Sequence, residues 1–243
     1  MSKTIAIIGA GEGVGYSLAQ RFGREGFQVA LLSRNPAKIN AIADRLSAKG
    51  IPAKAFRADV LDLPSLVSAL NDVKDHFGAI DVLEYSPMPE IQFSLPRNLS
   101  VEEQEFHLKI NVLGPVAAVK TVLPDMTERK SGTILFTGAV SALRPLAITA
   151  AYGVAAGAML NYSRILNKDV SSDGIFVSYI AIAAIVIPTG LTDSPVADCF
   201  PPNLPRVKSE DVADLHWKLY LNRDDTETVI GDADCLYATP GIY

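Results

Sequence analysis

The sequence contains few of the residues that build disulfide frameworks or metal centres. Cys199 and Cys235 are the only cysteines among 243 residues, which excludes a disulfide scaffold and favours a reducing compartment. The three histidines, His76, His107 and His216, lie far apart and lack the spacing of metal ligands. We therefore expect no metal cofactor.

An excess of positive charge and a long apolar run are also lacking. The 22 Lys and Arg residues against 27 Asp and Glu give a net charge of −5, which disfavours nucleic-acid binding. The longest nearly apolar run, 175–187, is shorter than the roughly 20 residues of a membrane span. Residues 5–10 are too few for a signal peptide. We expect a soluble cytoplasmic protein that binds neither nucleic acid nor membrane.

Hydrophobic residues make up 49% of the chain, enough for a sizeable core, and the length fits one α/β domain over residues 1–243. Short apolar runs alternate with helical patterns, and a capping box at Ser100 and Glu103 opens a long helix. This alternation predicts a Rossmann-type, doubly wound parallel sheet of about seven strands with helices on both faces. The expected strands are 4–8, 28–33, 53–57, 80–85, 133–137, 175–181 and 234–237, and the expected helices are 15–25, 36–48, 64–77, 100–123, 150–170 and 209–222. Ser209 is expected to cap the last helix.

A proline-rich segment, 188–208, follows the sixth expected strand. Open α/β sheets bind ligands at the carboxyl ends of their strands, so this segment is predicted to be a lid over a pocket. A structureless surface excursion is the alternative. Its apolar residues indicate a mainly hydrophobic small-molecule substrate, unless they pack on the body of the domain instead (Leu191, Val196, Phe200 and Leu204).

A glycine-rich turn joins the first strand to the first helix. It contains Gly9, Gly11, Gly13, Val14 and Gly15, and it presents a helix N-terminus to a pyrophosphate. The strand–turn–helix context makes a dinucleotide site the favoured interpretation, and a tight turn without a ligand is the alternative. Glu12 is unusual in such a turn, because a carboxylate repels a pyrophosphate unless it points away.

The end of the second strand selects the nucleotide. An acidic residue there binds the ribose of NAD, whereas an arginine accommodates the 2′-phosphate of NADP. The sequence has Ser33 and Arg34 at this point and no acidic residue before Asp44. We therefore predict NADP(H) as the cofactor, with a merely solvated Arg34 as the alternative.

With these features the chain resembles the short-chain dehydrogenase/reductase family over nearly its full length. The family turn TGxxxGxG matches Gly9, Gly13 and Gly15, with Ile8 in place of the threonine. By the same resemblance Asp59 and Val60 contact the adenine, and Ile185 packs against the nicotinamide. Asn111 and Tyr152, 41 residues apart, match the catalytic Asn and Tyr. The resemblance also implies a homodimer or homotetramer paired through helices 100–123 and 150–170.

The departures from the family are concentrated at its catalytic residues. Members of this family have a catalytic lysine four residues after the tyrosine, and this chain has Ala156 at that position. The catalytic serine of the family is replaced by Ala139. The family has an Asn-Asn-Ala-Gly stretch after the fourth strand, and this chain has Glu84 to Pro87 there. The family has Pro-Gly after the sixth strand, and this chain has Ile182-Ala183 instead. Residues four apart on a helix share a face, so the lysine would lower the tyrosine pKa, and alanine cannot.

Three hydroxyls, those of Ser141, Thr137 and Thr149, are candidates to replace the serine, and we select Ser141. Tyr152 is either a residual general acid or a packing residue, and Asn111 either holds a water or has only a helical role. Three functions follow: an NADP-dependent oxidoreductase with an atypical catalytic set, a nucleotide-binding sensor or partner subunit, and a non-redox enzyme such as an isomerase, cyclase or lyase. The first is favoured because the phosphate turn is intact.

Overall fold

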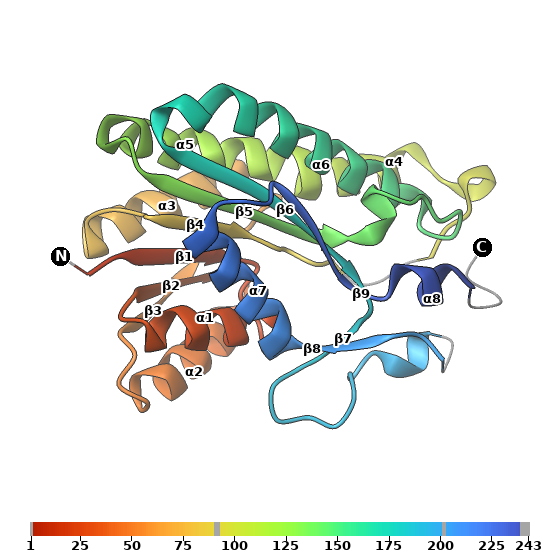
Figure 1. The fold of residues 1–243 in the computed structure, drawn as a ribbon, viewed down its shortest axis with the longest axis horizontal. Helices are drawn as coiled ribbons and strands as arrows, with labels where there is room; N and C mark the ends of the chain where they lie inside the picture. Colours follow the sequence, from red (N-terminus) through yellow and green to blue (C-terminus); the bar gives the residue numbers. More distant parts are fainter. Residues whose placement is uncertain (1, 90–92, 201–202, 239–243) are drawn as a thin grey trace.

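The computed structural model describes residues 2–89, 93–200 and 203–238. Within these residues a seven-stranded parallel sheet has the order β3-β2-β1-β4-β5-β6-β9 (Figure 1). The order reverses beside β1, so the Rossmann-type doubly wound sheet is confirmed. In that order the strands are Ala53–Arg57, Gln28–Ser33, Thr4–Ile8, Val82–Tyr85, Gly132–Ala139, Ile175–Ala183 and Glu227–Gly231.

Helices cover both faces of the sheet (Figure 1). On one face lie α1 (Val14–Arg24), α2 (Pro36–Ser47) and α7 (Ser209–Asn222). On the other lie α3 (Leu63–Phe77), α5 (Gly114–Arg129) and α6 (Ala150–Val170). Successive strand residues point to opposite faces, so central strands covered by helices on both sides consist of continuous apolar runs.

Helix starts follow local capping chemistry. Asn35 accepts a hydrogen bond from the Lys38 N–H, and Asp62 accepts one from the Ser65 N–H. Ser100 accepts one from the Glu103 N–H, which confirms the predicted cap of α4 (Val101–Leu108). The long helix predicted from residue 100 continues through a π-helical turn, η2 (Lys109–Leu113), into α5 and ends at Arg129.

Two expectations near the carboxyl terminus were wrong. The last strand is β9, and residues 234–237 belong to the helix α8 (Ala233–Ala238), because Asp232 accepts the Cys235 N–H and so caps a helical turn. Ser209 was predicted to cap α7. It is instead the first residue of that helix, and its hydroxyl accepts a hydrogen bond from Ser17 of α1.

The proline-rich segment leaves the sheet after β7 (Ile185–Ile187) and returns at β8 (Arg206–Lys208). These two short strands pair in parallel and close the base of the segment, which extends away from the main sheet (Figure 1). Among the described helices, the continuous stretch Val101–Arg129 is long and apolar enough to cross a membrane. Core helices of soluble proteins pass the same test, and its inner face packs in the core with Ile110, Ala118 and Val122.

Candidate active site

A cavity of about 440 Å³ lies at the carboxyl ends of the central strands. Its lining comes from the glycine-rich turn, the loop after β4, the end of β5, the start of α6 and the proline-rich segment. The walls are mainly apolar, with a few polar side chains among them. This is the position at which open α/β sheets bind ligands.

The glycine-rich turn forms one wall of the cavity. Gly9 has φ +93°, and a Cβ on it would lie 2.6 Å from the Pro87 backbone nitrogen. A Cβ on Gly15 would lie 2.9 Å from the Ala10 Cα, so both positions require glycine for close backbone packing. A Cβ on Gly13 would meet nothing within 4 Å and would occupy free space beside the turn. All of the predicted turn residues line the cavity: Gly9, Gly11, Gly13, Val14 and Gly15.

The start of α1 carries the features of an anion site. No side chain caps its N-terminus, and its first turn contains no acidic residue. The Tyr16 and Ser17 N–H groups donate to the Gly11 and Gly13 carbonyls, so the N–H groups of Val14 and Gly15 and the positive end of the helix dipole are available to a phosphate. The turn is held against β2, because the Gly9 and Ala10 N–H groups both donate to the Leu32 carbonyl.

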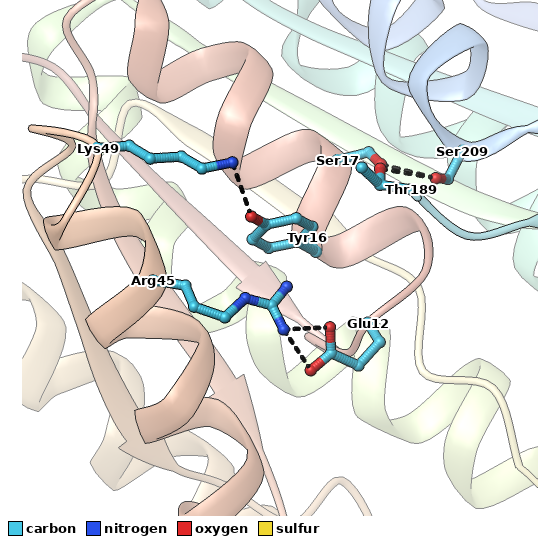
Figure 2. Close-up of polar contacts among 7 residues, drawn as sticks. All are labelled: Glu12, Tyr16, Ser17, Arg45, Lys49, Thr189 and Ser209. Atoms are coloured by element: carbon cyan, nitrogen blue, oxygen red, sulfur yellow. Dashed lines mark hydrogen bonds and ion pairs between the residues drawn. The ribbon is translucent and has the colours of Figure 1, made fainter. Parts of the chain in front are cut away.

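Glu12 is directed away from the cavity lining and toward α2 (Figure 2). Its carboxylate pairs with the Arg45 guanidinium at 2.9 Å. The same guanidinium lies over the Tyr16 ring, 4.2 Å from its centre, and the Lys49 ammonium donates to the Tyr16 hydroxyl. The pairing with Arg45 weakens the repulsion between Glu12 and an anion bound at the turn. Nothing in the local sequence identifies this partner, which is 33 residues away.

A second polar contact joins α1 to the proline-rich segment and α7 (Figure 2). The Ser17 hydroxyl lies 2.8 Å from the Thr189 hydroxyl and donates to the Ser209 hydroxyl at 2.7 Å. This contact holds the first residues of the proline-rich segment against the helix that follows the glycine-rich turn.

The other predicted cofactor residues lie along the same edge of the sheet. Ser33 ends β2 and the exposed Arg34 follows it, whereas Asp59 and Val60 follow β3. None of these four lines the cavity. Arg34 has no ion-pair partner among the described residues. Ile185, by contrast, is buried and lines the cavity at the start of β7.

Tyr152 and Ser141 both line the cavity. The Tyr152 hydroxyl accepts a hydrogen bond from the Ala139 N–H at 3.3 Å, and desolvation in the cavity wall raises its pKa to about 12. Ala156, in the place of the family lysine, is fully buried, so it neither lowers this pKa nor leaves room for a longer side chain. The phenol therefore stays protonated at neutral pH.

Asn111 lies in the π-helical turn and does not line the cavity. Its side-chain amide donates to the His107 carbonyl at 3.1 Å, and the buried Tyr85 hydroxyl donates to the neighbouring Ile110 carbonyl. Asn111 and Tyr85 therefore satisfy backbone carbonyls at an interruption of the helix, which is common at functional sites.

His107, which the sequence interpretation left without a role, lines the cavity beside Tyr152. The two rings meet edge to face, with centroids 6.0 Å apart. His107 precedes Asn111 by one helical turn, and this spacing is the sequence signal that could have identified it.

A buried polar network lies behind the cavity. Thr137 Oγ1 is 2.8 Å from Glu84 Oε1 and 2.7 Å from His216 Nε2, and His216 Nδ1 is 2.7 Å from the Val212 carbonyl. Ser86 donates to the second Glu84 oxygen. Burial raises the pKa of Glu84 to about 8 and lowers that of His216 to about 4. Sequence spacing gave no indication of this network, because its members come from β4, β5 and α7.

The hydrogen bonds define how this network is protonated. The Val212 carbonyl accepts, so His216 Nδ1 carries a proton, and in the neutral ring Nε2 then accepts from Thr137. Thr137 has a single proton, so a neutral Glu84 carboxyl donates to it in turn. Glu84 Oε1 and His216 Nε2 lie 3.9 Å apart, and the complete burial of both side chains favours this neutral arrangement over an ion pair.

The proline-rich segment contributes apolar residues to the cavity. Val196 and Phe200 line it, and the Phe200 ring meets Phe93 edge to face at 5.6 Å. Leu204 is buried but outside the lining, and Leu191 is exposed. Two of the four apolar residues that the sequence analysis named therefore line the cavity.

Comparisons with known proteins identify the family and the fold. Residues 3–198 match the family described as short chain dehydrogenase. An uncharacterized oxidoreductase of Staphylococcus epidermidis is 27% identical over 196 residues, covering 81% of this chain and 80% of its own length. Oxidoreductase UcpA of Salmonella typhimurium is 31% identical over 179 residues, covering 73% and 67%. L-sorbose reductase of Gluconobacter frateurii, crystallised with NADPH and L-sorbose, has a TM-score of 0.84 over 98% of both chains at 21% identity.

The family match covers the glycine-rich turn, the central strands and both helices that carry Asn111 and Tyr152. The chain belongs to the short-chain dehydrogenase family.

Proposed function

We propose that this protein is an NADP(H)-dependent oxidoreductase acting on the carbonyl or alcohol of a small, mainly hydrophobic molecule. The observation that carries the proposal is that one cavity connects the glycine-rich turn with Tyr152. A dinucleotide at the turn and a substrate at the tyrosine would therefore share a single cavity. Relatives named as oxidoreductases support this reaction class.

The residues at the turn fit a nicotinamide dinucleotide. The space beside Gly13, which a Cβ would enter, and the uncapped start of α1 suit a pyrophosphate. Ser33 and Arg34 would receive the ribose with its 2′-phosphate, Asp59 and Val60 the adenine, and Ile185 the nicotinamide. NADPH in the crystallised L-sorbose reductase supports the choice of this cofactor.

The bound cofactor would supply or accept a hydride. The chain would position the substrate and transfer a proton to or from the substrate oxygen. A phenol with a pKa near 12 offers an O–H group at neutral pH and is a poor base. Tyr152 is therefore suited to donate a hydrogen bond to a carbonyl oxygen, which favours the reductive direction. The apolar wall made by Val196, Phe200 and Phe93 would exclude water from this step.

The proposal is tested by NADPH oxidation with a panel of apolar ketones and quinones. Wild type should turn over at least one, and Tyr152→Phe should slow it by about 10- to 100-fold, because it removes the only phenol at the cavity wall among the described residues. NADPH binding should be unchanged in this variant. Binding without turnover on any carbonyl would support a nucleotide-binding sensor instead, an alternative favoured by the absent lysine.

Cofactor preference should reverse when the charge after β2 is reversed. Arg34→Asp is expected to weaken NADPH binding by about 10- to 100-fold and to leave or improve NADH binding, because hydrogen bonds to charged groups contribute about 1.5–3 kcal/mol. Fluorescence titration with both cofactors measures this. Arg24→Asp, at the far end of α1, is the control for the change in net charge. Equal affinities of wild type for both cofactors would contradict the role of Arg34.

We also propose a cytoplasmic homodimer or homotetramer that contacts no nucleic acid. Apolar side chains remain exposed on the helices expected to pair, with Val116 on α5 and Val154 and Ile165 on α6. Pairing through a closed symmetric interface would bury them.

A further inference from the structure

We propose that the His107 imidazole binds the substrate oxygen, together with the Ser141 hydroxyl, in the place of the missing serine at Ala139. This inference rests on the proposed function, since it assigns the group that holds the substrate of that reaction. The ligand that it predicts is a carbonyl or hydroxyl oxygen on an apolar body.

The first argument is that His107 has an unsatisfied polar atom in the cavity wall. The side chain is 3% exposed, and its Nδ1 is buried with no hydrogen-bond partner among the described residues. Buried polar groups in folded proteins nearly always have partners, and exceptions call for a ligand, a water or a functional reason. The ring lines the cavity, so the partner that we infer is a ligand bound there.

The second argument is that the backbone of His107 is held in place. Its carbonyl accepts the Asn111 side-chain amide at 3.1 Å, at the start of the π-helical turn. Its ring packs edge-on against Tyr152. Asn111 is therefore a positioning residue for His107, and the imidazole and the phenol lie side by side on one wall.

The third argument concerns Ser141. It is also 3% exposed, lines the same cavity, and has an Oγ without a hydrogen-bond partner among the described residues. It follows Ala139 by two residues, on the short helical turn after β5. Two side chains from separate elements, each with an unsatisfied polar atom, thus line one mainly apolar cavity, which fits a ligand with a single polar group.

The charge state suits a hydrogen-bond donor. Burial lowers the pKa of His107, and the nearby Glu103 carboxylate offsets only part of this effect. A neutral imidazole has one N–H donor and one acceptor nitrogen. It can therefore donate to a carbonyl oxygen while avoiding the cost of an unpaired buried charge.

The test compares variants of His107 and Ser141, singly and combined, and one control in binding of acetophenone, a ketone with an apolar body, with and without NADP⁺. His107→Leu removes the donor, His107→Gln restores an N–H group, and His76→Leu replaces an exposed histidine on α3. Calorimetry gives the dissociation constants, ¹⁵N NMR follows the His107 ring, and thermal unfolding verifies the fold. NADPH binding is measured in parallel by fluorescence.

We expect acetophenone to shift the His107 ring nitrogens. His107→Leu should weaken acetophenone binding by about 5- to 10-fold, the value of one hydrogen bond. His107→Gln should recover part of this loss, and His76→Leu should match wild type. Adding Ser141→Ala to His107→Leu should cost less than the sum of the single losses if both groups hold one oxygen.

The inference is overturned if acetophenone leaves the ring nitrogens unmoved, or if folded His107→Leu binds it as well as wild type does. Either result leaves the proposed oxidoreductase intact when NADPH still binds and a carbonyl is still reduced. Failure of wild type to bind NADPH would instead contradict the proposed function, while the acetophenone titration still decides the role of His107.

Discussion

Gly9→Ala is expected to abolish cofactor binding and to destabilise the fold. The residue has φ +93°, and a Cβ would lie 2.6–2.8 Å from the backbone of Ser86 and Pro87. Positive φ and a backbone collision each cost about 1–3 kcal/mol, so we expect a loss on the order of 3–4 kcal/mol. For a chain of this size that is a drop in Tm of about 10 °C, measured by thermal unfolding.

Substitutions at two further glycines separate the effect of positive φ, the effect of the backbone collision and the effect on cofactor binding. Gly26→Ala has a similar φ of +89° but free space around its Cβ, so it should cost only about 1 kcal/mol. Gly13→Ala also has free space, so it should keep most of the stability yet weaken NADPH binding at least tenfold, because the methyl group fills the phosphate cradle. Wild-type NADPH affinity in Gly13→Ala would argue against a pyrophosphate at the turn.

Glu84→Gln should make folding stability less sensitive to pH. The pKa of Glu84 is raised by burial from 4.5 to about 8. Between these values the folded state holds a proton that the unfolded state releases, so wild-type stability falls as pH rises. In this range the free energy of unfolding decreases by about 1.4 kcal/mol per pH unit. The glutamine side chain in this variant cannot ionise, and its amide still donates to Thr137, so the variant lacks this dependence.

The pH range of the measurement separates the effect of Glu84 on stability from that of His216. The pKa of His216 is lowered by burial from 6.5 to about 4, so its proton uptake in the unfolded state affects stability only below about pH 6.5. Urea unfolding between pH 6.5 and 8 should therefore show Glu84→Gln gaining about 2 kcal/mol relative to wild type. The exposed Glu128→Gln is the matched control. A stability difference that stays constant over this range would show that Glu84 is already ionised in the folded protein.

Local pattern in the sequence determined most of the fold. Alternating apolar runs and helical patterns predicted six of the seven sheet strands, and glycine spacing predicted the turn that lines the cavity. These features are local, because apolar periodicity and caps act within a few residues. The last strand was misplaced for the same reason. The segment 227–231 is only partly buried at the sheet edge, and its pattern is correspondingly weak, whereas Asp232 makes the following residues helical.

The sequence alone also showed that the lysine and serine of the family motif are missing at Ala156 and Ala139. Only the tertiary structure decided what surrounds Tyr152 in their absence. His107 reaches the cavity because the helices α4 and α6 pack together. Glu84 meets His216 because its side chain leaves β4 on the face of the sheet that α7 covers, although the two elements lie far apart in the chain. Burial then sets the pKa values of these groups, and burial depends on all the elements packed around a residue rather than on its neighbours in sequence.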